Sequence, residues 1–271
     1  MANEYHDHEE LKLAVDDASL WITLSNSEKR NALTPTMIDS LVDTLIKADR
    51  DSSIRAIVIT GEGKGFSAGG DLKAMIEDTG MFKGSVEELR QRYMHGIQMI
   101  PRTIESLQTP VIAMVNGAAI GAGCDLAMMC DLRIGCEASA FGETFSKLAL
   151  VPGDGGAYFL IRAVGYAKAM EMILTGDIYR GEQAHHFGLL NFYVEAETLK
   201  ESTKGLVKRI TSNSPVAMGM SKKALRHGYR EGLDSHLDLL AAFQGITQRS
   251  EDHKEGVKAF LEKRAPQFTG H

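Results

Sequence analysis

Two turns rich in small residues constrain this chain more than any other feature. FSAGGDL (residues 66–72) and AIGAGCDL (residues 119–126) each follow an apolar run, open a helical pattern and carry an acid near the helix start. A helix N-terminus presents unpaired N–H groups and partial positive charge, and small residues let its backbone approach a ligand closely. Either turn alone is better explained by close packing of a helix on a strand. The pair together predicts N–H groups from two helix starts aimed at one oxyanion.

The segment GEGKGF, residues 61–66, also invites a nucleotide-binding interpretation, which its details oppose. The dinucleotide motif G-x-G-x-x-G would need glycine where Phe66 stands. No strand is evident where an acid should follow, about twenty residues later. A phosphate-binding P-loop would need G-K-S or G-K-T, whereas this chain has G-K-G. Nucleotide binding of either type is therefore not expected.

The composition is that of an ordinary globular protein. Of the 271 residues, 44% are hydrophobic and 24% are charged, which suits a sizeable core and argues against wholesale disorder. The net charge of −6 opposes a nucleic-acid or anionic membrane surface, except as a local basic patch. The apolar stretch from Val111 is interrupted by Asn116 and Asp125, so it does not predict a membrane span. We expect neither nucleic acid nor a membrane as a partner.

The cysteines and the first residues indicate the compartment. Cys124, Cys130 and Cys136 are odd in number and six residues apart, which fits neither a disulfide framework nor the usual zinc spacings. We expect buried free thiols and no metal site. The start MANEYHDHEE is polar and acidic, unlike a signal peptide. These features predict a cytoplasmic protein.

Hydrophobic periodicity predicts an α/β chain. Residues 11–24 are expected to form a hairpin, and residues 37–51 a helix capped by Thr34 or Thr36. Residues 54–61 and 110–117 are expected to be buried strands. Each of these two strands is followed by a glycine-rich turn and then a helix.

Three regions are expected along the chain. Residues 1–10 should be a flexible tail, and residues 11–200 a core of repeated strand–turn–helix units. Residues 201–271 have the pattern of long amphipathic helices. One α/β domain with a helical C-terminal extension is the simplest arrangement.

Six segments, in this order along the chain, resemble the crotonase, or enoyl-CoA hydratase/isomerase, superfamily. They are NSEKRNAL (26–33), GKGFSAGGDLK (63–73), VNGAAIGAGCDLAMMCDLRI (115–134), LVPGDGGAYFLIRAVG (150–165), MILTGDIYRGEQAHHFGLLNFYV (172–194) and AFLEKR (259–264). The resemblance covers nearly the whole chain. It implies a crotonase-like spiral of ββα units with a C-terminal helical trimerisation region. The chain would then form a homotrimer or a dimer of trimers.

The resemblance also implies how an acyl-CoA would bind. The N–H groups of Gly70 and Ala122 would hold the thioester oxygen as it becomes an enolate oxyanion, each donor contributing ~3–4 kcal/mol to lowering the barrier. Coenzyme A would enter as part of the substrate, with no other cofactor. Residues 75–100 would form the acyl pocket.

The resemblance implies that eight residues contact coenzyme A, and two of them are weaker candidates than the rest. Gly70, Asp71, Leu72 and Lys73 would line its path, with Lys29 and Ala32 as weaker candidates, and Phe260 and Lys263 would reach the coenzyme A of a neighbouring subunit. For Lys73 and Lys263, an ordinary solvated lysine is the alternative.

The acids depart from the family pattern. Family hydratases use two glutamates; the first falls on Asp125, and the second on Phe145, which can do no proton chemistry. Asp154 resembles an aspartate that some double-bond isomerases of the family carry in this loop. We expect Asp154 to be the principal acid/base, with Asp125 second and Glu143 a distant third. The alternatives are that Asp125 favours a helix start and that Asp154 is a turn residue.

A catalytic carboxyl here would need a raised pKa to act near neutral pH. Apolar side chains available to desolvate it are Phe66, Phe141, Phe145 and Leu148. The resemblance thus implies an enzyme that hydrates an unsaturated acyl-CoA or moves its double bond. The alternatives are a catalytically silent acyl-CoA-binding protein and another reaction of the family, such as C–C hydrolysis.

Overall fold

The computed structural model describes residues 4–271, and its largest element is a six-stranded sheet in the order β1-β2-β3-β5-β7-β10. Its strands are β1 (Leu11–Asp16), β2 (Ser19–Leu24), β3 (Ala56–Gly61), β5 (Val111–Val115), β7 (Leu132–Gly135) and β10 (Phe192–Tyr193). β1 and β2 pair antiparallel, which confirms the predicted hairpin, and the other pairs are parallel. Every residue of β3 and β5 is buried, as expected for parallel strands covered on both faces.

A second sheet of four short strands has the order β4-β6-β8-β9. Its strands are β4 (Gly65–Ser67), β6 (Ala118–Ile120), β8 (Ala140–Gly142) and β9 (Ile178–Arg180). β4 and β6 lie inside the segments predicted as plain glycine-rich turns, and that part of the prediction was wrong. Strands of three residues are too short to show an alternating pattern. With them, the units that begin at β3 and at β5 are each a longer strand, a short strand and a helix, the ββα arrangement expected.

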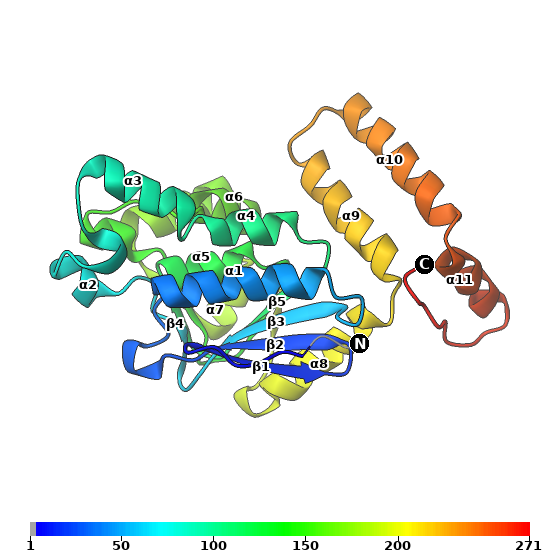
Figure 1. The fold of residues 1–271 in the computed structure, drawn as a ribbon, viewed down its shortest axis with the longest axis horizontal. Coiled ribbons are helices and arrows are strands. Elements are labelled where there is room, and N and C mark those ends of the chain that lie inside the picture. The colour runs from blue at the N-terminus through cyan, green and yellow to red at the C-terminus, as the bar shows by residue number, and fades with distance from the viewer. Residues whose placement is uncertain (1–3) are drawn as a thin grey trace.

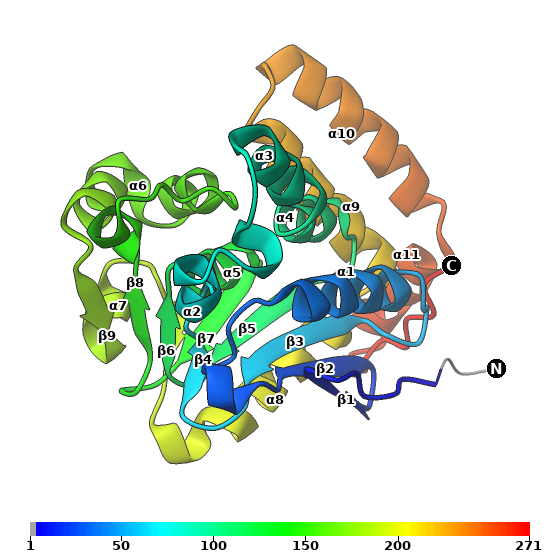
Figure 2. The same ribbon diagram turned by 60° about the vertical axis from the view of Figure 1, so that its left-hand side comes forward.

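Helices cover both faces of the larger sheet (Figures 1 and 2). On one face lies α1 (Pro35–Asp49), whose N-cap is Thr34: the Thr34 hydroxyl accepts a hydrogen bond from the Met37 N–H at 3.1 Å. On the other face α8 (Leu199–Thr211) packs Leu199, Leu206 and Val207 into an apolar cluster with strand residues. The remaining helices of the core are α2 (Leu72–Ile76), α3 (Val86–His95), α4 (Met99–Ser106), α5 (Ala122–Met129), α6 (Gly156–Thr175) and α7 (Gly181–His186).

The C-terminal helices lie together at one end of the molecule (Figure 1). They are α9 (Pro215–Gly228), α10 (Leu233–Gln248) and α11 (Glu251–Leu261). Large apolar side chains on them are exposed, among them Leu225 at 76% and Phe260 at 83%. A contact with another subunit would cover such a surface. Trimer formation itself stays a prediction.

The start of the chain is held against the body from Glu4 onward. The Tyr5 hydroxyl donates a hydrogen bond to Asp51 at 3.0 Å, and Lys47 donates to the Glu4 carbonyl at 2.6 Å. Residues 4–10 of the predicted tail are therefore anchored, and residues 1–3 lie outside the described part. Within residues 4–271, no helix is both long and apolar enough to cross a membrane.

Candidate active site

The two turns predicted to act together lie side by side. Gly69 has a φ of +82°, and a Cβ added there would lie 2.5 Å from the Ile120 carbonyl oxygen and 2.9 Å from the Ala122 nitrogen. A Cβ added at Gly123 would overlap the Ser67 carbonyl oxygen. Both positions therefore require glycine, because the backbone of one turn touches that of the other.

The N–H groups of Gly70 and Ala122 are available for a ligand. Among residues 4–271, no acceptor is recorded for either group. Ala122 begins α5, all of whose residues are buried, and the preceding Gly121 offers no side-chain cap. Helix starts normally have such N–H groups satisfied by a cap, water or a ligand. The structure thus brings the two predicted donors to adjoining turns and leaves both without a protein partner.

Three carboxyl groups from distant parts of the sequence meet beside these turns. Asp125 comes from the first turn of α5, Glu143 from the residue after β8, and Asp154 from the loop before α6. Their exposed fractions are 0%, 1% and 2%. Asp125 lies directly on the start of α6, where a Cβ added at Gly156 would overlap its carboxyl group. We call Asp125, Glu143 and Asp154 the acid cluster.

No cation or amide neutralises the acid cluster. Among the described residues, none of its six carboxyl oxygens meets a donor with hydrogen-bond geometry. Asp125 lies within hydrogen-bonding reach of both Asp154 and Glu143. A bond between two carboxyl groups requires a proton on one of them, so the cluster must retain protons to form these contacts.

Burial controls the ionisation of the acid cluster. It raises the pKa of Asp125 well above its ordinary value, and the charges of Asp154 and Glu143 raise that pKa further. Burial raises the pKa of Glu143 to about 7. It also raises the pKa of Asp154, an effect that the contact with Asp125 partly offsets. Carboxylates desolvated in this way become bases that act near neutral pH.

Phe145 brings an apolar ring to the same place. A Cβ added at Gly121 would lie 3.8 Å from the ring carbon Cζ of Phe145, which puts the ring beside the start of α5. Phe66 and Phe141 are fully buried, as expected of side chains that exclude water. Leu148 is 48% exposed, so its expected part in desolvating a carboxyl group was wrong. It lies in the short 3-10 helix Thr144–Leu148, in which no residue is fully buried.

Two residues that the sequence did not single out hold the Asp154 loop. Gln98 donates a hydrogen bond from Nε2 to the Gly153 carbonyl at 2.8 Å. The Tyr93 ring lies against the same glycine, 3.1 Å from where its Cβ would be. Burial and then the charge of Asp154 raise the Tyr93 pKa. No motif marks either residue, because their role depends on α3 and α4 crossing this loop.

A groove of about 520 Å³ gathers the residues predicted to contact coenzyme A within one chain. Its lining includes Lys29, Ala32, Gly70, Asp71, Leu72 and Lys73. Lys29 Nζ lies 3.2 Å from Asp71 Oδ2. The Asp71 carboxylate caps α2 by accepting the N–H groups of Lys73 and Ala74, both at 3.1 Å, and these bonds and Lys29 lower its pKa.

Phe260 and Lys263 do not reach this groove in the same chain. Phe260 lies on α11 and Lys263 just beyond it, whereas the groove runs along α2 at the opposite end of the molecule (Figure 1). Their predicted contact with coenzyme A therefore requires a second subunit.

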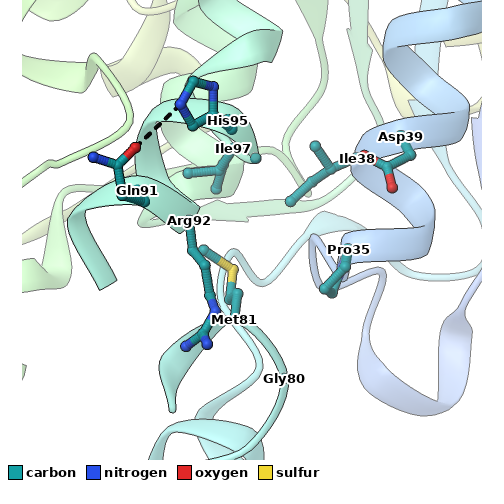
Figure 3. Close-up of a pocket in the computed structure, with 10 residues that line it drawn as sticks. Pro35, Ile38, Asp39, Gly80, Met81, Gln91, Arg92, His95 and Ile97 are labelled. Carbon is teal, nitrogen blue, oxygen red and sulfur yellow. Dashed lines mark hydrogen bonds between the residues drawn. The ribbon is translucent and has the colours of Figure 1, made fainter. Parts of the chain in front are cut away.

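A separate hollow of about 490 Å³ lies between the start of α1 and the end of α3 (Figure 3). Ile38, Met81 and Ile97 give it an apolar wall, and Gln91 contacts His95 at its rim, with 3.2 Å between Oε1 and Nε2. It uses part of the segment 75–100 predicted for the acyl group. It contains none of the acid cluster.

The chain matches known proteins along most of its length. A family model described as enoyl-CoA hydratase/isomerase matches residues 16–271. The chain is 36% identical to 1,2-epoxyphenylacetyl-CoA isomerase of Escherichia coli, over 94% of this chain and 97% of that protein. It is 34% identical to 2,3-dehydroadipyl-CoA hydratase of the same organism, over 96% and 99%.

A solved structure gives the same result. The crystal structure of enoyl-CoA hydratase from Bacillus anthracis superposes with a TM-score of 0.89 at 30% identity, over 97% of this chain and 100% of that one. The chain therefore belongs to the enoyl-CoA hydratase/isomerase family of the crotonase superfamily, and it is an enzyme of that family.

Proposed function

We propose that this enzyme moves the double bond of an unsaturated acyl-CoA, with Asp154 as the principal acid/base. One observation carries the proposal: among the described residues, buried carboxyl groups without a cation or amide partner lie beside the turns that carry Gly70 and Ala122, while the position of a second family glutamate holds Phe145. A double-bond shift needs one carboxylate that removes a proton and returns it elsewhere. Hydration must also activate a water molecule.

The steps balance without any other reactant. In a 3-enoyl-CoA, the Asp154 carboxylate takes a proton from C2, and the electron pair of that C–H bond moves into the thioester. The negative charge on the thioester oxygen is held by the N–H groups of Gly70 and Ala122, which are preorganised for it. The thioester carbonyl then re-forms and its electron pair makes the C2=C3 bond. The electron pair of the C3=C4 bond takes the proton back from the Asp154 carboxylic acid at C4, which gives the 2-enoyl-CoA.

Coenzyme A would lie in the groove along α2, as part of the substrate. Lys29 and Lys73 supply positive charge for its phosphate groups, and the side chain of Lys73 is 83% exposed, with only a long 3.8 Å contact to Glu77. Phe260 and Lys263 would complete the site from a neighbouring subunit of a homotrimer or dimer of trimers. Sedimentation of the protein with and without acyl-CoA tests this assembly.

Hydration is the second candidate, and a specific contact favours it. Asp125 has Glu143 as well as Asp154 within hydrogen-bonding reach, so two carboxyl groups could hold a water molecule between them. One would take its proton as oxygen adds to C3, and the other would deliver a proton to C2.

One pair of assays separates these reactions. A 3-enoyl-CoA would be followed for conversion to the conjugated 2-enoyl-CoA, and crotonyl-CoA would be followed for loss of conjugation in water. Faster conversion of the 3-enoyl-CoA supports the shift, and faster hydration of crotonyl-CoA contradicts it. Neither reaction, with acyl-CoA still bound in calorimetry, would point to a silent binding protein or to C–C hydrolysis.

A further inference from the structure

We infer that Glu143 is a positioning residue of this site: its carboxyl group shares a proton with Asp125 and thereby sets the basicity of Asp154. The consequence for turnover rests on the proposed function, whereas the proton sharing can be tested without it.

The placement of Glu143 follows from β8. All three residues of this strand are buried between β6 and β9, and the carbonyl of its last residue, Gly142, accepts the Gly121 N–H at 2.8 Å. That bond ties the end of β8 to the turn that carries Ala122. The next residue, Glu143, therefore enters the site at the level of α5, and Phe145 lies two residues further on.

The surroundings of Glu143 are acidic or apolar. The titratable groups that face it are Asp125 and the Cys124 thiol of α5 and, from the loop before α6, Asp154. Tyr93 of α3 acts on the far side of the cluster, at Asp154. None of these groups is a cation, and Glu143 itself is 1% exposed. A surface role or an ion pair therefore does not explain a glutamate here.

Asp125 occupies the middle of the three acids. It is within hydrogen-bonding reach of Asp154 on one side and of Glu143 on the other. A single proton on Asp125 can be donated to one of these neighbours at a time. When Asp154 is ionised it can accept that proton's hydrogen bond, and once Asp154 has taken a proton from substrate, Glu143 is the remaining acceptor. Asp154 and Glu143 together thus keep Asp125 protonated in both states of Asp154.

The family position that holds an acid in hydratases holds Phe145 here, yet a carboxyl group is present. It comes from two residues earlier in the chain. Glu143 therefore supplies an acid beside Asp125 from a backbone position two residues before Phe145.

The decisive variant is Glu143→Gln, which removes the charge and keeps the shape. Without the Glu143 charge, the pKa values of Asp125 and Asp154 should fall, because like charges raise one another's pKa. We expect the acidic limb of the kcat/KM profile against pH to move down by about one unit, with a lower maximal kcat and a KM changed by less than about twofold.

A second variant, Glu143→Met, which is apolar and of similar length, should move the limb in the same direction. Glu201→Gln on the exposed surface of α8 is the control and should leave the profile in place. An unshifted limb in both Glu143 variants overturns the inference.

A second measurement separates this inference from the proposed reaction. The free energy of unfolding is compared near neutral pH, where Glu143 with its pKa of about 7 is partly ionised, for the wild type, Glu143→Gln, Asp125→Asn and the double variant. Because the two carboxyl groups share a proton and repel one another, the changes in the free energy of unfolding should not add in the double variant. Additive changes overturn the inference. Non-additive effects in a protein that turns over no enoyl-CoA would reject the proposed function and keep the proton sharing.

Discussion

Asp71 and Asp125 look alike in the sequence and differ in the structure. Each follows a glycine-rich turn at a helix start, in SAGGDL and GAGCDL. Asp71 is the N-cap of α2, accepts two N–H groups, pairs with Lys29, and has a lowered pKa. Asp125 lies inside α5 against two other acids, and its pKa is raised. A carboxylate used for binding stays charged in water, whereas one used for proton transfer is kept dry and unpaired.

The largest expected effect is on turnover, from matched Asp→Asn changes. Asp154→Asn should lower kcat by about 10²–10⁴-fold, because it removes the base from the reacting atoms. Asp71→Asn keeps a good N-cap and should change kcat by no more than about fivefold. Steady-state kinetics and calorimetric acyl-CoA affinity check this. Equal turnover in wild type and Asp154→Asn would remove Asp154 from the mechanism.

The second effect is on stability against pH. Glu143 has its pKa raised from 4.5 to about 7 on folding, so the folded state holds its proton more tightly. That contribution is complete below the unfolded pKa and is lost as pH rises through the folded one. The loss is about 3 kcal/mol at 1.36 kcal/mol per unit. Denaturant unfolding at several pH values should show the decline in wild type and a flatter curve in Glu143→Gln.

Asp71 supplies the opposite sign. Its lowered pKa contributes stability that is present above the unfolded value of 3.8 and is lost as pH falls. The free energy of unfolding of Asp71→Asn should therefore fall less than that of the wild type as the pH is lowered, because the other acids still contribute. A decline at high pH that Asp71→Asn removes, and Glu143→Gln does not, would reverse the assignment of the two kinds of acid.

A third effect should come from steric pressure on the acid cluster. Gly156→Ala places a methyl group on the Asp125 carboxyl group, and overpacking of this kind typically costs about 1–3 kcal/mol. Thermal unfolding and kcat should both fall. Gly205→Ala, in α8 with open space around its Cβ position, is the control and should stabilise by about 0.5–1 kcal/mol. Equal responses of the two variants would contradict the contact between Gly156 and Asp125.

The smallest effect is expected at the exposed end of the groove. Lys73→Ala should raise the KM for acyl-CoA by no more than about fivefold, since an exposed ion pair contributes about 0–1 kcal/mol. Added salt should shrink the difference. A fall in kcat with unchanged KM would contradict a role for Lys73 in binding coenzyme A.

Local sequence predicted much of this fold because its signals lie within a few residues. The β1–β2 hairpin, the Thr34 cap of α1 and the buried strands β3 and β5 each depend on neighbouring side chains. The adjoining turns around Gly70 and Ala122 could be anticipated from their small residues. β4 and β6 were missed because strands of three residues are too short to show an alternating pattern.

The acid cluster could be predicted only in part. Asp125 and Asp154 are identifiable from the motifs that contain them, whereas Glu143 ranks only third from the sequence, as an acid close to Phe145 and in the same strand phase. Tyr93, Gln98 and Gly156 carry no sequence signal for their contacts with this site.

By itself, the sequence determined the family, the order of the ββα units and the two glycine-rich turns, since these depend on residue type and short spacing. Only the tertiary structure decided the charge state of the site. Whether a carboxyl group is a paired cap or a dry base depends on which distant segments surround it, and α5, β8 and the loop before α6 come together only when the chain has folded.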